Sequence, residues 1–124
     1  MGGAPTTEKG QRAERLAEAY LTRAGYRVLE RNYRCRVGEI DLIAEENGVL
    51  CFIEVRSLQS LAHGHPFETI DAGKQARLIR AVRHYLSRRG GADREMRFDA
   101  VAVIYQPAPQ IELIRGAFES SDPW

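Results

Sequence analysis

The stretch GEIDLIAEENGVLCFIEVRS (residues 38–57) contains two apolar runs that meet at Asn47-Gly48. An Asn-Gly pair is a strong hairpin signal because both residues tolerate the positive φ angles of a two-residue turn. We therefore predict two antiparallel strands, over residues 38–45 and 49–57. Carboxylates interrupt both apolar runs, and carboxylates within buried strands require a partner.

The first interruption is Asp41 and the second is Glu54. A two-residue turn places these carboxylates opposite each other, and it places Glu39 opposite Arg56. Opposed residues have Cβ atoms roughly 5 Å apart, so the two carboxylates repel unless a positive charge compensates. Either Arg56 neutralises them in a structural ion-pair cluster, or a divalent cation such as Mg²⁺ binds to their oxygen atoms.

Strand alternation divides the predicted hairpin into two faces. The first face is apolar throughout and is expected to be core; it carries Ile40, Leu42, Ala44, Cys51, Ile53 and Val55. The second face is apolar near the turn and charged at its far end; it carries Glu39, Asp41, Ile43, Phe52, Glu54 and Arg56. The charged residues therefore form one cluster at one end of a half-buried face.

A helix and a further strand precede the hairpin. Over residues 8–24 apolar side chains recur at three- and four-residue spacing, which predicts an amphipathic helix that stops at Gly25. Residues 26–34 are typical of a strand that carries arginines on its outer side.

The segment after the hairpin predicts a loop, a helix and two strands. Residues 58–70 contain glycine and proline and indicate the loop. Asp71 is a candidate N-cap for a helix over 72–89, and strands are predicted over 96–105 and 110–116. The order αβββαββ indicates an α/β or α+β layer fold in which helices cover a mixed β-sheet.

Size and composition fit one globular domain. The chain has 124 residues, of which 44% are hydrophobic and 28% charged, and we expect a domain over 8–118 between a flexible lead (1–7) and a tail (119–124). No apolar run approaches the roughly 20 residues needed to cross a bilayer, and the N-terminus lacks the hydrophobic segment of a signal peptide. The expectation is a cytoplasmic protein with no membrane partner and two free thiols.

The motif residues resemble a known class of enzyme. A strand Asp, a hairpin and Glu-x-Lys on the next strand form the signature of the PD-(D/E)XK nucleases, and the corresponding residues here are Asp41 and Glu54-Val55-Arg56. More closely, the chain resembles the YraN-like family of small, uncharacterised bacterial proteins, which is proposed to be endonuclease-like and related to archaeal Holliday-junction resolvases. The matching segments, in the family's order, are GQRAERLAEAYLTRAGYRVLERNYR, GEIDLIA, FIEVRS, GKQARLIRAVRHYL and RFDAVAV.

The resemblance implies a restriction-endonuclease-like α/β fold and a metal-dependent endonuclease that acts on or binds DNA, including branched DNA, as a homodimer. It implies that Asp41, Glu54 and the main-chain carbonyl of Val55 hold a divalent cation, Mg²⁺ or Mn²⁺. Glu14, on the first helix, matches a family carboxylate that adds a ligand directly or through water. Asp99 is instead expected to make structural hydrogen bonds.

The chain departs from the nuclease signature at the lysine, which is Arg56 here. An arginine keeps the positive charge and can grip a phosphate, but its pKa is too high for it to transfer protons. The second basic position of the family is also absent, because Leu58 stands there. Lys74, in the first turn of the second predicted helix, is the candidate replacement. The alternative function is a catalytically impaired nucleic-acid-binding or protein-interaction module on the same fold.

The formal net charge is only +1, but residues 72–97 hold eight Lys or Arg against two acidic residues. This local excess either attracts phosphates or forms a solvated helix face. Under the nuclease interpretation, the residues expected to contact nucleic-acid phosphates are Arg56, Lys74, Arg77, Arg80 and Arg83.

Overall fold

The computed structural model describes residues 8–62 and 72–118. The elements in these ranges are α1 (Glu8–Arg23), β1 (Arg27–Cys35), β2 (Gly38–Glu46), β3 (Val49–Leu58), α2 (Ala72–Arg89), β4 (Met96–Ile104) and β5 (Gln110–Phe118). Their order confirms the predicted αβββαββ, and every boundary lies within two residues of the predicted one. The expected lead, tail and Asp71 cap, and most of the expected loop, lie outside the described residues.

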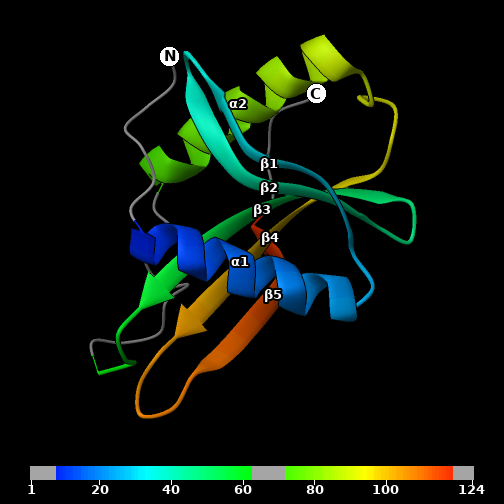
Figure 1. Cartoon of the computed structure of the whole chain (residues 1–124). Coiled ribbons are helices and arrows are strands. Elements are labelled where there is room, and N and C mark those ends of the chain that lie inside the picture. The colour runs from blue at the N-terminus through cyan, green and yellow to red at the C-terminus, as the bar shows by residue number, and fades with distance from the viewer. Residues whose placement is uncertain (1–7, 63–71, 119–124) are drawn as a thin grey trace.

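The strands form one five-stranded sheet in the order β1-β2-β3-β4-β5. All neighbouring pairs are antiparallel except β3 and β4, which are parallel. Parallel neighbours need a long crossover connection, and α2 lies in that connection. The two helices cover opposite faces of the sheet (Figure 1). This confirms the predicted α/β fold, a central mixed sheet flanked by helices.

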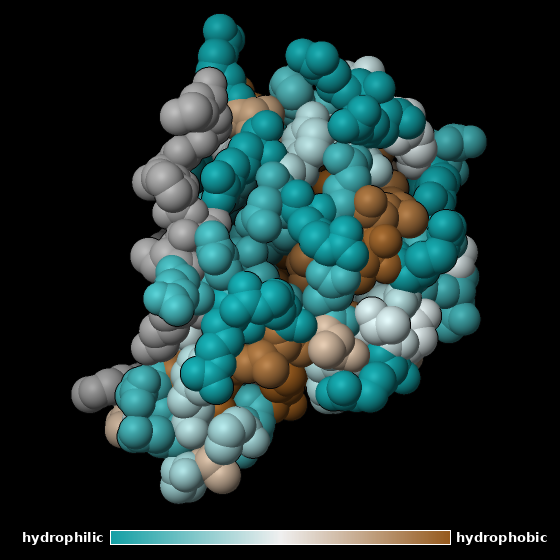
Figure 2. Space-filling view, viewed as in Figure 1, coloured by the Kyte–Doolittle hydropathy of each residue, from teal (hydrophilic) through white to brown (hydrophobic). Residues whose placement is uncertain are grey.

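Helix α1 covers one face of the sheet. Ala13, Ala17 and Leu21 on the helix belong to the same core cluster as Leu42 and Ile53 on the sheet. Small residues on the helix allow it to approach the sheet closely. In Figure 2 hydrophilic side chains cover the outer side of α1, and hydrophobic side chains show on both sides of the helix.

Helix α2 covers the opposite face. Its buried residues include Val82 and Tyr85, which belong to a second core cluster with Ile43, Phe52 and Phe98. Strands in the middle of the sheet are therefore buried on both faces, as expected where helices cover both sides. Among the described residues no helix has both the length and the apolar content needed to cross a membrane.

Gly25 ends α1, as predicted. Its φ is +106°, a conformation that L-residues rarely adopt. The backbone N–H of Tyr26 donates to the carbonyl of Leu21 at 2.9 Å, which is the six-to-one bond of a Schellman cap. The cap turns the chain back toward the sheet, and Tyr26 is buried there.

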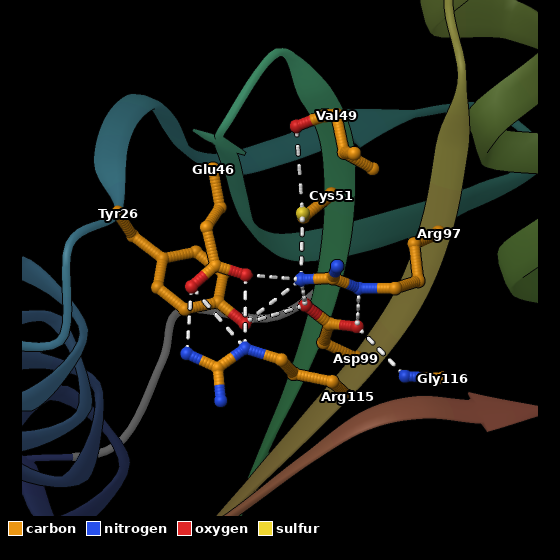
Figure 3. Close-up of polar contacts among 8 residues, drawn as sticks. All are labelled: Tyr26, Glu46, Val49, Cys51, Arg97, Asp99, Arg115 and Gly116. Atoms are coloured by element: carbon orange, nitrogen blue, oxygen red, sulfur yellow. Dashed lines mark hydrogen bonds and ion pairs between the residues drawn. The ribbon is translucent and has the colours of Figure 1, made fainter.

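Tyr26 joins a polar network at the end of the sheet nearest the β2–β3 turn (Figure 3). Its hydroxyl donates to Asp99 Oδ2 at 2.7 Å, and Arg97 donates to both oxygens of Asp99 at 2.8 and 2.9 Å. The backbone N–H of Gly116 donates to Asp99 Oδ1 at 3.0 Å. Asp99 therefore makes structural hydrogen bonds, as predicted.

Glu46 is the second carboxylate of this network and is also buried. It accepts hydrogen bonds from Arg115 and Arg97, each with a shortest distance of 2.6 Å (Figure 3). These bonds, Arg115 first, hold the pKa of Glu46 down at about 2, although burial acts in the opposite direction. The network thus ties β2, β4 and β5 together on the α1 side of the sheet.

Candidate active site

Strands β2 and β3 pair only over the half of the hairpin next to the turn. Their ladder runs from the pair Glu46–Val49 to the pair Leu42–Ile53, in the predicted register. Beyond this point β3 continues with β4 on one side, and β2 continues with β1 on the other. The far ends of β2 and β3 are therefore not paired with each other.

Because the strands separate, the cross-strand pairs of charged residues that we predicted do not form in the ladder. The pairs Asp41–Glu54 and Glu39–Arg56 were expected from an uninterrupted ladder, but they lie beyond its end. The two-residue turn fixes the register only while the strands remain hydrogen-bonded to each other.

Strand alternation is also interrupted at Asp41. Leu42 packs in the core on the α1 side, whereas Ile40, two residues away, packs in the core on the α2 side. The register of β1 and β2 puts Asn32 opposite Asp41, and Asn32 has a φ of +51°, which no regular strand residue adopts. The prediction that Ile40 shares a face with Leu42 was therefore wrong, because both strands rotate locally at this point.

The side chain of Asp41 bridges the gap between the separated strands. The backbone N–H of Val55 on β3 donates to Asp41 Oδ2 at 2.8 Å. A side-chain oxygen thus takes the place of a main-chain acceptor from β2. The carboxylate of Asp41 is therefore hydrogen-bonded to the residue that follows Glu54.

A cavity of about 640 Å³ lies beside this junction. Its lining comes from β2 and β3, from the ends of β1 and β5, from the first two turns of α2 and from the β1–β2 turn: Arg34, Cys35, Arg36, Val37, Gly38, Glu39, Asp41, Ile53, Glu54, Val55, Lys74, Gln75, Arg77, Leu78 and Phe118. The structure thus brings five of the predicted site residues together around one cavity: Asp41, Glu54, Val55, Lys74 and Arg77.

Two cations approach the carboxylate of Glu54. Arg56 Nε and Lys74 Nζ each lie 3.9 Å from Glu54 Oε1. The Arg56 side chain is only 13% exposed and does not line the cavity, whereas the Lys74 side chain is 45% exposed and does. Arg56 therefore pairs with Glu54 from within the protein, whereas Lys74 pairs with Glu54 from the side of the cavity.

Asp41 carries an unusual pKa. Burial raises the pKa of its carboxyl to about 7, and the negative charges of Glu14, Glu39 and Glu54 act in the same direction. The hydrogen bond from Val55 opposes the rise. A carboxylate in such surroundings is stabilised either by a proton or by a metal cation.

Glu14 is half-buried on α1 and near enough for its charge to affect Asp41. It does not line the cavity. Over residues 8–62 and 72–118, the His, Cys, Asp and Glu side chains form no group of three or more that could hold a metal ion. The oxygen donors at the cavity, from Asp41, Glu54 and the main chain of Val55, nevertheless suit Mg²⁺ or Mn²⁺, which commonly keep several water ligands.

The remaining predicted phosphate contacts separate into two sets. Arg77 lines the cavity, but Arg80 and Arg83 are exposed positions on α2 that do not. Sequence reasoning missed the contribution of the β1–β2 turn, from which Arg34 and Arg36 reach the cavity. The signal was available as arginines flanking a short turn, although their proximity to α2 is a tertiary feature.

Gly38 sets the distance between that turn and α2. A Cβ atom at this position would lie 2.7 Å from the carbonyl oxygen of Arg77 and 3.4 Å from Cβ of Ala81. Only a residue without a side chain allows β2 to begin so close to the helix backbone. The wall of the cavity at Gly38 therefore requires a glycine at this position.

The fold and the cavity define an α/β domain with a five-stranded mixed sheet and a carboxylate-lined cavity beside its second helix. The model of the Uncharacterised protein family UPF0102 matches residues 13–103, and the chain belongs to this family. This confirms the predicted YraN-like membership.

The relatives are similar over most of their length. A UPF0102 protein of Anaeromyxobacter sp. is 49% identical over 112 residues, which cover 90% of this chain and 84% of that protein. A UPF0102 protein of Moorella thermoacetica is 46% identical over 113 residues, 89% of this chain and 94% of the relative. One from Nitrosococcus oceani is 46% identical over 120 residues, 95% of this chain and 97% of the relative.

Proposed function

We propose that this protein is a phosphodiesterase of the endonuclease type that acts on DNA with bound Mg²⁺ or Mn²⁺. The observation that carries the proposal is the cavity shared by Asp41, Glu54 and Lys74. Two carboxylates for a metal and one amine for a phosphate are the groups that metal-assisted phosphodiester hydrolysis requires. The resemblance of Asp41 and Glu54-Val55-Arg56 to the PD-(D/E)XK signature supports the same reaction.

Each residue has a distinct role in this proposal. Asp41, Glu54 and the carbonyl of Val55 would hold the divalent cation, which when bound polarises the phosphate and lowers the pKa of a water molecule. Lys74 contacts a phosphate oxygen and stabilises the charge that develops on it. Arg56 is the ion-pair partner of Glu54, and the part of the signature lysine falls to Lys74.

The basic residues of α2 are the reason for proposing a nucleic acid as the substrate. Arg77 lines the cavity beside Lys74, and Arg80 and Arg83 lie outside it on exposed positions of the same helix. These residues bind neighbouring phosphates without selecting a base sequence. Branched DNA is the proposed substrate structure because the family resemblance extends to junction resolvases.

A cleavage screen tests the proposal. Purified protein is incubated with Mg²⁺ or Mn²⁺ and four-way junctions, flaps, single strands and duplexes of DNA, with RNA as a comparison. We expect metal-dependent cleavage of a DNA structure that is lost in Glu54→Gln and retained in Arg23→Ala, an exposed position on α1. Absence of metal-dependent cleavage on every substrate contradicts the proposal.

A second candidate function follows from Arg56. With arginine at the lysine position, the domain is a DNA-binding module that keeps the fold but has lost cleavage. This version predicts salt-sensitive DNA binding that survives Asp41→Ala. Cleavage that appears in Arg56→Lys would instead show an impaired enzyme. The proposed homodimer is tested separately, by light scattering of the purified protein across a concentration series.

A further inference from the structure

A second cavity, of about 610 Å³, adjoins the first. It lies between the β1–β2 turn and the last turns of α2, and residues 34–37 line both cavities. We infer that this second cavity binds a backbone phosphate of the same nucleic-acid strand whose scissile phosphate occupies the first cavity. The inference rests on the proposed function and adds the direction in which the strand leaves the active site.

The charge of the second cavity favours an anion. Four arginines line it: Arg34, Arg36, Arg88 and Arg89. Glu39 pairs with Arg34 and Glu30 pairs with Arg89, each at 3.3 Å. Arg36 and Arg88 are exposed and form no ion pair with any carboxylate in the described parts of the chain. Counted over the described residues, the cavity therefore carries an excess of two positive charges, supplied by one residue of the turn and one of the helix.

A neutral donor completes the lining. The hydroxyl of Tyr33 and Nδ1 of His84 are 2.6 Å apart. In the tautomer in which Tyr33 donates to Nδ1, the proton of the imidazole is on Nε2, where it can be donated to an anion. The pKa of Tyr33 is raised, chiefly by burial, while the charges of Arg88 and Arg89 act in the opposite direction, so both guanidiniums lie near this pair.

The two cavities follow one side of α2. Lys74 and Arg77 line the first, and His84 and Arg88 line the second. Steps of three, seven and four residues keep all four on one face of a helix. Between the two sets, Gly38 lies close to the helix backbone at Arg77 and lines the first cavity.

The spacing suits two nearby phosphates of one strand. At 1.5 Å per residue, Arg77 and His84 are separated by about 10 Å along α2. Along the axis of a duplex a strand advances about 3.4 Å per nucleotide, so a strand that runs beside α2 covers this separation within a few nucleotides. One strand that follows α2 past Gly38 would therefore present a phosphate to each cavity.

The test uses a double variant, Arg36→Ala with Arg88→Ala. Its matched control is Arg23→Ala, which removes an exposed arginine from the last turn of α1, on the other face of the sheet. Binding of fluorescently labelled junction and single-stranded DNA is followed by anisotropy over a salt series. We expect the double variant to bind more weakly and its slope of log affinity against log salt to fall by about one, the value for one lost phosphate contact. We expect the control to match the parent in both DNA affinity and salt slope.

Two outcomes overturn parts of this scheme separately. If the parent binds and cleaves DNA but the double variant keeps the full salt slope, the second phosphate site is rejected while the proposed function stands. If the parent neither binds nor cleaves DNA, the proposed function fails, and inorganic phosphate is titrated into ¹⁵N-labelled protein. If the amide chemical shifts of Arg36, His84 and Arg88 change with phosphate in the parent and not in the double variant, the second cavity is still an anion site. If they do not change in the parent, the anion site is rejected.

Discussion

The backbone N–H of Val55 donates a hydrogen bond to the carboxylate of Asp41 at 2.8 Å, across the gap where β2 and β3 separate. The bond fixes the position of Asp41, while burial and three neighbouring carboxylates raise its pKa to about 7. Substitution can separate these two properties. Asparagine keeps an acceptor for Val55 and has no charge, whereas alanine removes both.

The first prediction concerns stability without metal. In the unfolded chain Asp41 ionises near its ordinary pKa of 3.8, and in the folded protein near 7, so the folded state retains the proton longer. Native stability is therefore lost as pH rises between these values. Asp41→Asn should match the parent near pH 4 and exceed it at pH 8 by on the order of 2 kcal/mol.

Urea unfolding in the presence of a chelator measures this difference. Asp41→Ala, which leaves the Val55 N–H without its acceptor, should be less stable than Asp41→Asn at both pH values. An equal offset between Asp41→Asn and the parent at pH 4 and pH 8 would contradict the raised pKa.

The second prediction concerns the metal. Binding of a cation requires Asp41 to be ionised, so protons compete below its pKa. We expect Mn²⁺ affinity, measured by calorimetry, to fall about tenfold from pH 8 to pH 6, since one unit below the pKa leaves about one carboxyl in ten ionised. Glu54→Gln should bind Mn²⁺ weakly at both values. A pH-independent affinity would remove Asp41 from the ligand set.

The third prediction assigns the lysine function to Lys74. Because Lys74 lines the cavity and Arg56 does not, Lys74→Met should lower kcat by 10²–10³, whereas Arg56→Lys should leave it within tenfold of the parent. Single-turnover cleavage of the best substrate from the screen measures both. A large gain in Arg56→Lys together with no loss in Lys74→Met would reverse the assignment and favour the impaired-enzyme function.

The fourth prediction concerns Gly38. In Gly38→Ala the new Cβ meets the carbonyl of Arg77 at 2.7 Å, so β2 or α2 must move. We expect a loss of 1–3 kcal/mol in the free energy of unfolding, which is typical of overpacking, and weaker DNA binding. Val37→Ala, at the neighbouring exposed residue, serves as the control for urea unfolding. Unchanged stability in Gly38→Ala would show that the turn can shift freely.

The fifth prediction concerns the polar network near the β2–β3 turn. The pKa of Glu46 is lowered from 4.5 to about 2, so its ion pairs stabilise the fold above pH 4.5 and are lost as pH falls toward 2. Glu46→Gln should lower the free energy of unfolding by about 3 kcal/mol at pH 7, and the difference should vanish near pH 2. Glu45→Gln, at the adjacent exposed ion pair, should have a smaller effect. An equal loss of unfolding free energy in both variants would contradict a larger contribution from the ion pairs of Glu46.

Local signals in the sequence were sufficient for the elements and their order. Asn47-Gly48 set the hairpin turn, helical periodicity located α1 and α2, and Gly25 ended α1. Each of these features depends on residues close together in the chain. Three of the predicted site residues, Asp41, Glu54 and Lys74, line one cavity, and their functional roles stay predictions.

The details that the sequence did not reveal depend on distant partners. The β2–β3 ladder ends where β2 continues to pair with β1 and β3 continues to pair with β4. Opposite Asp41, Asn32 has a positive φ that interrupts the regular strand conformation of β1. Glu46 is buried because Arg97 and Arg115 arrive from strands that are far away in the chain. Charge alone selected Arg80 and Arg83, but the helix register places His84 and Arg88 at the second cavity instead.

The early end of the β2–β3 ladder makes the two ends of β2 mechanically unequal. Near Glu46 the strand is tied to β4 and β5 by buried ion pairs, so movement there breaks strong contacts. From Asp41 to Gly38 it has no ladder bonds to β3, and it is held by its pairing with β1, by the hydrogen bond of Asp41 and by the packing of Ile40 and Gly38 against α2. A displacement of the β1–β2 hairpin at the cavity would therefore break fewer interstrand hydrogen bonds than one near Glu46.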